Sequence, residues 1–376
     1  MDVLKRAEST ITKHGLANFD TPVLLMVSGG SDSTALAYLS SDLVEQGVVG
    51  PCALLHVNHR LRGEAADEDA RFVGELAALL DLPFFCCEVD VAALVEQEGA
   101  NLEAVARRER YAAAHEALTS LCRHTGAPLS SGRIFTAHTA DDRVENFYMR
   151  SIVGTGPGGF RAMRYLNGQV ARPVLEVGRD DLRAYLAERA QSGAPVQRDG
   201  EGELWREDAT NAHTDRFRAF VRHNIVPQAK ERNPQLLETL TRTMNLIADE
   251  DDMLEERASE VVERCVSWIE PDEARVGDFG SGCVLAPPFA REPHPLKRRV
   301  VVRVLACLLG DEARVETVAV DAVLASYRDS EVNSGYATNI QGDLAVSANK
   351  RGVRIEPMAA FRARRKRDGA RTGERT

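Results

Sequence analysis

The feature that most constrains this chain is a short apolar run that ends in a turn rich in glycine and serine. Residues 23–27 are apolar, residues 28–33 read Ser-Gly-Gly-Ser-Asp-Ser, and a helical pattern follows over 34–45. An apolar run of this length, bounded by glycine, predicts a buried strand. Glycine lets the backbone approach a ligand closely, and the start of a helix presents unpaired N–H groups to an anion. The segment therefore predicts a strand–turn–helix unit that cradles a phosphate group.

Strand and helix patterns alternate through the first half of the chain. This alternation predicts an α/β fold in which a parallel sheet is covered by helices on both faces. Ligands of such sheets bind beyond the carboxyl ends of the strands. Besides the first unit, the predicted strands are 52–57, 84–91 and 134–138, and the predicted helices are 68–80, 102–124, 141–152 and 179–191.

The second half predicts a smaller, mainly helical domain. Its helical patterns are separated by a passage rich in glycine and proline, and short strand-like runs follow between 336 and 355. The last residues hold seven basic and two acidic side chains, a composition typical of disorder. The predicted helices are 234–266, 296–309 and 315–327, and the predicted domains are 1–230 (α/β), 231–361 (C-terminal, helical) and 362–376 (basic disordered tail).

Composition excludes several classes of protein. No apolar stretch is long enough to span a membrane and the N-terminus has no apolar signal core, so we expect a cytoplasmic protein with no membrane partner. The seven cysteines form no C-x-x-C pair, which argues against a disulfide framework or a zinc or iron–sulfur site. The net charge of −10 argues against a protein that coats nucleic acid with its whole surface, although local basic strips can still bind RNA.

Asp32 lies inside the predicted phosphate turn. A carboxylate there would repel phosphate, so it is best explained as a ligand of Mg²⁺ that bridges to phosphate oxygens. The turn lacks the G-x-x-x-x-G-K-[ST] pattern of a Walker loop, and no lysine follows it. The alternative is an ordinary strand–helix turn in which Asp32 only caps the helix.

Two further polar segments follow predicted strands. His56 begins the run His-Val-Asn-His-Arg-Leu-Arg, whose donors and acceptors can hold a nucleotide or form a polar loop. His138 ends another strand, and Asp142 and Glu145 share a face of the helix that follows. The helix macrodipole also favours carboxylates in the first turn of a helix, so capping alone could explain one of these two.

Arginines gather on the helix predicted over 102–124. Arg107 and Arg110 face the same way because they are three residues apart. A solvated charged face is the default for such a helix.

Five segments, in this order, resemble the PP-loop (N-type) ATP pyrophosphatase superfamily and, within it, the tRNA(Ile)-lysidine synthase family. The resemblance spans about residues 20–230 and implies an α/β fold of the adenine-nucleotide α-hydrolase type. The rest of the chain looks like the single RNA-facing domain of the short family form. The five segments are SGGSDS at 28–33, HVNHRLR at 56–62, ARRERY at 106–111, AHTADDRVEN at 137–146 and EDATN at 207–211.

The resemblance implies a ligase that uses ATP and Mg²⁺. Its substrates would be L-lysine and the wobble cytidine of tRNA(Ile) with a CAU anticodon, joined through an adenylated cytidine, so that codon reading changes from AUG to AUA. The resemblance is also compatible with a homodimer. Two alternatives remain: another PP-loop enzyme with a different nucleophile, such as a tRNA thiolation enzyme or an amidotransferase-type synthetase, and a non-catalytic RNA-binding paralogue.

The resemblance also implies roles for single residues, several of which carry two roles. The implied residues are Ser28, Gly29, Gly30, Ser31, Asp32, Ser33 and His56 for ATP; Asp32 for the metal; Asp32, His138, Asp142 and Arg107 for catalysis; Asp142, Glu145 and Arg110 for lysine; and Arg218, Arg222, His223 and Arg299 for tRNA.

The chain departs from the family pattern at five positions. Three lie in the helix that carries the acidic residues, and two lie in a stretch that the family uses to bind tRNA. The phosphate turn keeps the family pattern. The departures are Thr139, Arg143, Asn146, Ala219 and Phe220.

Overall fold

The computed structural model describes residues 2–206, 217–269, 282–310 and 313–373, with side chains described up to residue 366. The chain forms two compact units, Met1–Ala248 and Asp249–Thr376. The boundary therefore lies at residue 248, not near 230, because the first half of a long helix packs with the α/β unit through Leu236 and Met244. The segment EDATN at 207–211 lies outside the described residues.

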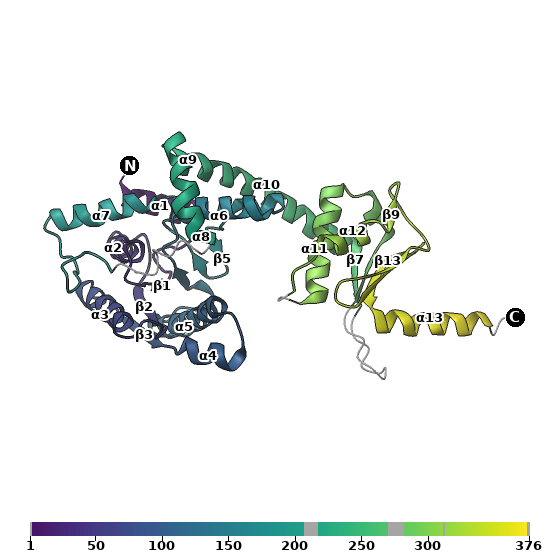
Figure 1. Cartoon of the computed structure of the whole chain (residues 1–376), viewed down its shortest axis with the longest axis horizontal. Coiled ribbons are helices and arrows are strands. Elements are labelled where there is room, and N and C mark those ends of the chain that lie inside the picture. The colour runs from purple at the N-terminus through teal and green to yellow at the C-terminus, as the bar shows by residue number, and fades with distance from the viewer. Residues whose placement is uncertain (1, 207–216, 270–281, 311–312, 374–376) are drawn as a thin grey trace. The chain divides into compact units, whose positions relative to one another are not determined.

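The first unit contains a six-stranded sheet, and the predicted α/β fold class is confirmed (Figure 1). Every neighbouring pair is parallel except the last, at one edge. In spatial order the strands are β3 (Phe84–Glu88), β2 (Cys52–Asn58), β1 (Val23–Met26), β4 (Arg133–Phe135), β6 (Val170–Ala171) and β5 (Leu166–Asn167).

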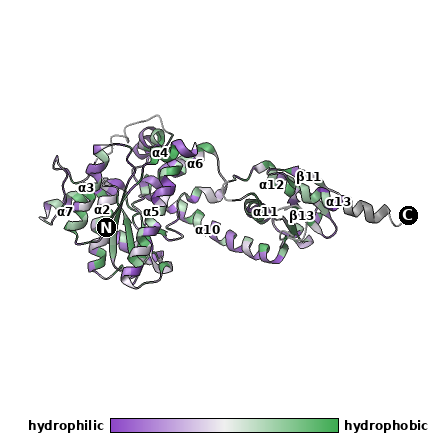
Figure 2. Cartoon of the chain, turned by 90° about the horizontal axis from the view of Figure 1, so that it is seen from below, coloured by the Kyte–Doolittle hydropathy of each residue, from purple (hydrophilic) through white to green (hydrophobic). Residues whose placement is uncertain are grey.

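Helices cover both faces of this sheet because its central strands are apolar on both sides (Figure 2). Successive side chains of a strand point to opposite faces. Leu25 and Leu54 pack on one face of the sheet, whereas Leu24 and Leu55 pack on the other face with Leu118. The first face is covered by α1 (Val3–Lys13), α2 (Ser31–Glu45), α3 (Glu64–Leu79) and α7 (Arg179–Gln191), and the second face by α5 (Leu102–Thr125).

The order of the strands places a ligand crevice between β1 and β4. From β1 the chain proceeds to β2 and β3 on one side and then crosses to β4 on the other. Ligands of open α/β sheets bind outside the carboxyl ends of the strands at such a switch point. The phosphate turn follows β1 and His138 follows β4, so the topology brings them to one place.

The strand predicted over 84–91 is shorter than expected and a helix follows it. β3 ends at Glu88, and the Oδ1 of Asp90 accepts a hydrogen bond from the N–H of Ala93, 3.0 Å away, which starts a helix. An N-terminal cap of this kind overrides the apolar pattern. The remaining helices of this unit are α4 (Val91–Glu98), α6 (Ala140–Val153), α8 (Phe217–Phe220) and α9 (Val226–Arg232), with a π-helix at Val221–Ile225 and 3₁₀ turns at Leu129–Ser131 and Pro157–Arg161.

The second unit contains a five-stranded antiparallel sheet packed against helices. Val300, Val304 and Val320 of the helices meet Val346 and Ile355 of the strands in a separate core. In spatial order the strands of this sheet are β11 (Ala337–Ile340), β12 (Leu344–Asn349), β13 (Gly352–Pro357), β8 (Gly282–Leu285) and β7 (Val266–Ile269). A separate hairpin pairs β9 (Tyr327–Arg328) with β10 (Glu331–Val332). The helices are α11 (His294–Leu309), α12 (Thr317–Leu324) and α13 (Met358–Gly373), with a 3₁₀ turn at Pro287–Arg291. The helix α10 (Leu236–Cys265) crosses the boundary between the units.

The disorder predicted over 362–376 is not observed at residues 362–373, since α13 continues to Gly373, and residues 374–376 lie outside the described residues. Arginine, lysine and alanine are good helix formers, so a basic composition does not prevent a helix. Arg364 also donates to a carboxylate oxygen of Glu356, 2.5 Å away, which fixes the start of α13 to β13. Across the part of the chain that the structure describes, no helix is both long and apolar enough to traverse a bilayer.

Candidate functional site

A cavity of about 1230 Å³ opens at the carboxyl ends of β1, β2 and β4. Ordinary small-molecule sites measure about 300–1,000 Å³, so this one has room for a nucleotide and a second ligand. Three of the residues to which the sequence analysis gave a role are not in its lining: Gly29, Arg218 and Arg299. Those that do line it are Ser28, Gly30, Ser31, Asp32, Ser33, His56, Arg107, Arg110, His138, Asp142, Glu145, Arg222 and His223.

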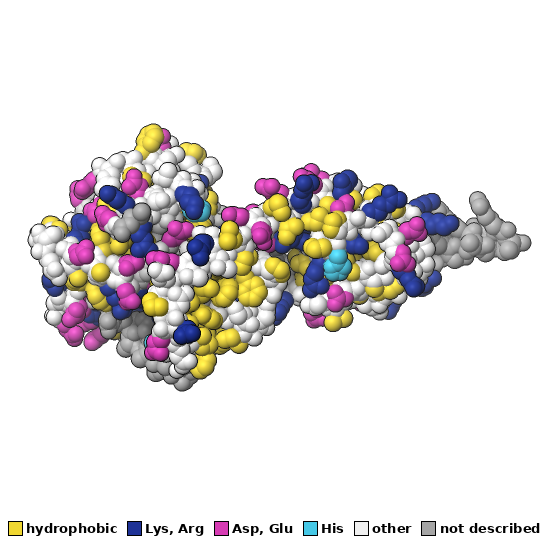
Figure 3. Space-filling view, turned by 90° about the horizontal axis from the view of Figure 1, so that it is seen from above, with side chains coloured by type: hydrophobic (Ala, Val, Ile, Leu, Met, Phe, Trp, Pro, Cys, Tyr) yellow, Lys and Arg dark blue, Asp and Glu magenta, His cyan; other side chains and the backbone are white. Residues whose placement is uncertain are grey.

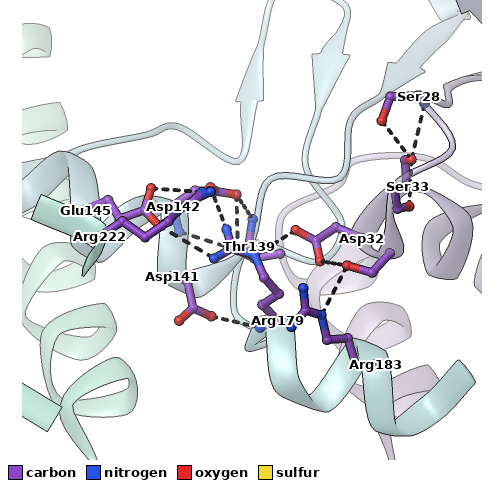
Figure 4. A network of polar contacts seen from close by, with 12 residues as sticks. Ser28, Asp32, Ser33, Thr139, Asp141, Asp142, Glu145, Arg179, Arg183 and Arg222 are labelled. Carbon is purple, nitrogen blue, oxygen red and sulfur yellow. Dashed lines mark hydrogen bonds and ion pairs between the residues drawn. The ribbon is translucent and has the colours of Figure 1, made fainter. Parts of the chain in front are cut away.

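The phosphate turn, residues 28–33, is held by its own serines (Figure 4). The Oγ of Ser33 accepts from the N–H of Ser28 at 3.2 Å and lies 3.1 Å from the Oγ of Ser28. Gly29 has a φ of +92°, a conformation that only glycine adopts at low cost. Its carbonyl accepts from the N–H of Arg206 at 2.9 Å, so a distant segment supports the turn. The helix α2 begins within this segment, at Ser31.

Asp32 points from this turn toward α7. Its Oδ2 accepts from the Nε of Arg179 at 3.1 Å, and its Oδ1 accepts from the hydroxyl of Ser31 at 3.2 Å. Burial raises the pKa of Asp32, and the positive charge of Arg179 offsets this only in part. Arg179 therefore compensates only in part for the burial of this carboxylate.

Asp32 fits a magnesium site of the type in which the ligand supplies most donors. Mg²⁺ is commonly held by one or two carboxylates plus substrate phosphates. Asp32 offers that carboxylate beside the phosphate turn, and its raised pKa marks it as a group that a cation would stabilise. Among the residues that the structure describes, no group of three or more His, Cys, Asp and Glu could hold a metal without a ligand's help.

His56 is a buried residue of β2 that also lines the cavity. Its Nδ1 lies 2.9 Å from the carbonyl of Val27. A carbonyl only accepts, so Nδ1 carries the proton, and burial lowers the pKa of the ring. Neutral His56 therefore presents Nε2 as an acceptor, as an adenine amino group would require.

Arg107 and Arg110 reach the cavity from α5. The guanidinium of Arg107 lies 4.9 Å from the ring centre of Tyr111, and the Nη2 of Arg110 lies 3.3 Å from the Nε2 of His59. Burial lowers the pKa of His59 to about 4, and Arg110 adds to this effect. The α5 side of the cavity is thus positively charged, whereas Arg108, on the same helix, pairs with Glu98 outside the lining.

Asp141, Asp142 and Glu145, here called the acid cluster, lie in the first two turns of α6 (Figure 4). Asp142 caps its own helix, because its Oδ2 accepts from the N–H of Thr139 at 2.8 Å in a capping box. Its other oxygen, Oδ1, accepts from Arg218 at 2.8 Å and from Arg179 at 3.2 Å. One oxygen is therefore structural, and the other faces cations.

Glu145 is nearly inaccessible and bonds to two arginines. Its Oε1 accepts from the Nε of Arg222 at 2.7 Å, and its Oε2 accepts from the Nε of Arg218 at 2.9 Å. Asp142 lies next to Glu145. Burial alone would raise the pKa of Asp142, but the positive charges of Arg179 and Arg218 outweigh burial and lower it. The two neighbouring carboxyl groups are consequently both placed to face positive charge.

His138 lies beside the acid cluster and is neutral. Its Nδ1 is 2.9 Å from the hydroxyl of Thr136. Burial lowers its pKa to about 4, although Asp142 acts in the opposite direction. A pKa this low makes His138 a weak proton acceptor and a better hydrogen-bonding group.

The structure explains three of the five departures from the family pattern. Thr139 is the N-terminal cap of α6, and Asn146 accepts from Arg150 at 2.7 Å. Arg143 points away from the cavity and is fully buried. It donates to the hydroxyl of Tyr165 and to the Oδ1 of Asn245, both at 3.0 Å, and so fixes α6 to α10.

Sequence reasoning missed Arg179, which connects the two halves of the site. Its side chain bonds to Asp32 and Asp142, and its N–H donates to the Oδ2 of Asp141 at 2.8 Å. The sequence shows only an arginine at the start of a helix, which is no signal by itself. Lys230 is also part of the site, since its Nζ donates to the Oδ1 of Asp141 at 2.8 Å.

The four arginine and histidine residues expected to bind tRNA have different surroundings. Arg218 and Arg222 pair with the acid cluster, and His223 lines the same cavity. Arg299 belongs to the second unit, where it pairs with Asp251 at 2.7 Å and with Glu255 of α10. Figure 3 shows Lys and Arg interspersed with Asp and Glu on the face drawn, so positive charge is not continuous there.

Comparisons with known proteins agree with this geometry. Three bacterial proteins named tRNA(Ile)-lysidine synthase are similar to this chain. That of Geobacter sulfurreducens is 33% identical over 323 residues, covering 85% of this chain and 62% of the relative. That of Thermus thermophilus is 36% identical over 303 residues, covering 80% and 52%. That of Solibacter usitatus is 34% identical over 307 residues, covering 80% and 60%.

The chain thus spans about half to three-fifths of the length of these curated relatives. The profile of the PP-loop domain family matches residues 4–229, which is more than half of the chain and includes the phosphate turn and the acid cluster. The chain therefore belongs to the PP-loop family.

Proposed function

We propose that this protein is a tRNA(Ile)-lysidine synthase, a ligase that joins L-lysine to the wobble cytidine of tRNA(Ile) with a CAU anticodon. The observation that carries this proposal is that the phosphate turn and the acid cluster line one cavity. A site for a triphosphate beside a site for an organic cation is what ATP-dependent attachment of lysine requires. The cytoplasm, where ATP and tRNA meet, is the compartment that this function requires.

The first step is adenylation of the RNA base. The carbonyl oxygen of the cytidine attacks the α-phosphate of ATP, the bond to the β-phosphate breaks, and pyrophosphate leaves into the turn 28–33. The N–H groups at the start of α2 and the hydroxyls of Ser28 and Ser33 are suited to hold that anion. Positioning and electrostatic stabilisation dominate such transfers.

Mg²⁺ would be held by Asp32 together with phosphate oxygens. When bound, it supplies positive charge to the phosphates during the transfer. Arg107, at the α5 side of the cavity, is placed to contribute further positive charge.

The second step is attack by lysine. Its ε-amine forms a bond to the adenylated carbon of the base, and AMP leaves. Asp142 and Glu145 are suited to bind the ammonium form, and Arg110 to bind the carboxylate of the amino acid. The ammonium must lose a proton before it attacks. Because His138 has a low pKa, we assign it the role of orienting the amine by a hydrogen bond.

RNA must reach this cavity with the target base unstacked. Arg218, Arg222 and His223 lie at or beside the cavity and are suited to bind the phosphates of a splayed anticodon loop. Arg299 is the proposed contact in the second unit. Phosphate contacts of this kind give affinity without reading sequence. A homodimer is compatible with this arrangement, and sedimentation would test it.

Mass spectrometry of the RNA product tests the proposal. The full chain is incubated with tRNA(Ile), ATP, Mg²⁺ and isotopically labelled lysine, and nuclease fragments of the anticodon loop are analysed. We expect a lysine adduct on the wobble cytidine, and none when ATP is omitted. Pyrophosphate release without the adduct would contradict the proposal.

The alternatives give different outcomes in the same assay. A PP-loop enzyme with another nucleophile would release AMP only with that nucleophile, and a thiolation enzyme usually needs the cysteine pair that this sequence lacks. A non-catalytic RNA-binding paralogue would show no RNA-dependent exchange of labelled pyrophosphate into ATP.

A further inference from the structure

Two arginines expected to bind RNA are paired instead with the carboxylates expected to bind lysine. The Nε of Arg222 lies 2.7 Å from Glu145, and the Nε of Arg218 lies 2.9 Å from the same side chain. Arg218 also donates to Asp142 at 2.8 Å. The cation positions that an ammonium group would take are therefore filled by the protein itself.

The arginines cover the carboxylates from the outside. The side chain of Glu145 is 2% exposed and that of Asp142 is 11% exposed, whereas those of Arg218 and Arg222 are 46% and 28% exposed. Arg222 lines the same cavity as Glu145, so an ammonium group that enters there competes with its guanidinium for this carboxylate.

The acid cluster and Asp32 together have as many carboxylates as they have cation partners. In the ion pairs between described residues, Asp32, Asp141, Asp142 and Glu145 face four cations. Burying an additional charge in such a place is unfavourable, and so is leaving a buried carboxylate without a partner. A lysine ammonium can therefore enter most easily by exchange for one of the cations. The four cations are Arg179, Arg218, Arg222 and Lys230.

Arg218 and Arg222 are the cations most able to leave. Arg179 is 18% exposed, less than either of them, and is shared among Asp32, Asp142 and Glu145. Lys230 pairs with Asp141 rather than with the lysine-binding pair. Arg222 lies in the π-helix Val221–Ile225, a rare helix geometry that is common at functional sites. A displaced guanidinium needs a new anion, and RNA phosphates supply one.

We propose that Arg218 and Arg222 occupy the lysine ammonium site in the free protein, and that RNA phosphates draw them away and open the site. This inference rests on the proposed function. Lysine and RNA then bind with positive coupling, although they need not touch. The coupling is reciprocal, so lysine tightens RNA binding by the same factor.

Equilibrium dialysis of radiolabelled L-lysine against the full chain tests the proposal. ATP is omitted so that no product forms, and the RNA is an anticodon stem–loop with a CAU loop. For the wild type we expect the lysine Kd to fall about tenfold when RNA is added. L-norleucine, which lacks the ε-amine, should show no such change.

The variant Arg222→Gln separates exchange from simple RNA contact. It removes one of the guanidinium groups that pair with Glu145, so lysine should bind about tenfold more tightly without RNA, and addition of RNA should lower the Kd less than in the wild type. Arg218→Gln should act in the same direction. Arg108→Gln is the matched control, because it removes an arginine from an ion pair with Glu98 outside the cavity and should behave as the wild type.

Two results would overturn the inference. One is a wild-type lysine Kd that is the same with and without RNA, a measurement that does not depend on how well any variant folds. The other is weaker lysine binding in both folded arginine variants, which would make these arginines direct supports of the pocket. Failure of the proposed function looks different, since lysine would then not bind at all and no adduct would form in the product assay.

Discussion

Asp32 combines a structural ion pair with the expected metal site. Asp32→Ala removes the carboxylate that would hold Mg²⁺, so we expect ATP–pyrophosphate exchange to fall by at least about 10²-fold, the usual scale for loss of an electrostatic contact in the transition state. RNA affinity, measured by filter binding, should change by less than about threefold, because Asp32 lies in the nucleotide part of the cavity. If RNA binding is lost as well, Asp32 is structural.

His138 should make folding stability depend on pH. Its pKa is about 4 in the folded protein and 6.5 in the reference state, so the unfolded chain binds the proton more readily. The stabilising contribution is full above pH 6.5 and is lost as the pH falls toward 4. His59 adds to this window in the same direction, whereas Asp142, with its pKa below 3.8, acts only at lower pH.

Urea unfolding at pH 7 and pH 5 measures this effect. We expect the wild type to lose more free energy of unfolding between these two values than His138→Gln does. Equal losses in the two proteins would show that the ring of His138 does not carry the pH dependence.

At the scale of elements, the turn between β1 and α2 offers a matched pair of glycines. Gly29 has a φ of +92°, so Gly29→Ala should cost about 1–3 kcal/mol in free energy of unfolding. Gly30 has a φ of −71°, and a Cβ there would lie 3.7 Å from the Oγ of Ser28, an ordinary contact. Gly30→Ala should therefore cost less than about 1 kcal/mol.

Chemical denaturation of the two variants beside the wild type makes the comparison. Equal stability of the two would mean that the turn relaxes around the methyl group added by Gly29→Ala and is not held by its serines. ATP affinity is a separate readout, because Gly30 lines the cavity.

At the scale of the whole molecule, the two units have separate hydrophobic cores. The chain contains two tryptophans, Trp205 in the first unit and Trp268 in the second. Each single-tryptophan variant, Trp268→Phe or Trp205→Phe, therefore reports on one unit. Addition of ATP and Mg²⁺ should raise the midpoint of thermal unfolding seen by Trp205, since a ligand stabilises the unit that binds it.

The midpoint seen by Trp268 should move by less than about 1 °C, because the described residues that line the cavity belong to the first unit. Trp205 itself lines the cavity, so the shift must also appear in calorimetry of the wild type. Equal shifts at both tryptophans would show that the two units unfold as one.

Local patterns in the sequence determined the strand–turn–helix unit and the α/β class, and they singled out thirteen of the residues that line the cavity. These features depend on neighbours in the chain: apolar alternation, glycine in a turn, and carboxylates at a helix start. The helix predicted over 179–191 was found at those residues, but its first residue, Arg179, had no signal. Its role arises because α7 ends up beside both the phosphate turn and α6.

Only the tertiary structure decided which charges meet. Arg143 is a buried link to Asn245, 102 positions further along the chain, and Arg218 and Arg222 cover the acid cluster from more than 70 positions away. Ion pairs depend on distance in space, and a sequence records spacing only along one chain. The same reason explains the boundary at residue 248 and the five-stranded sheet of the second unit, whose pairing unites segments from 266 to 357.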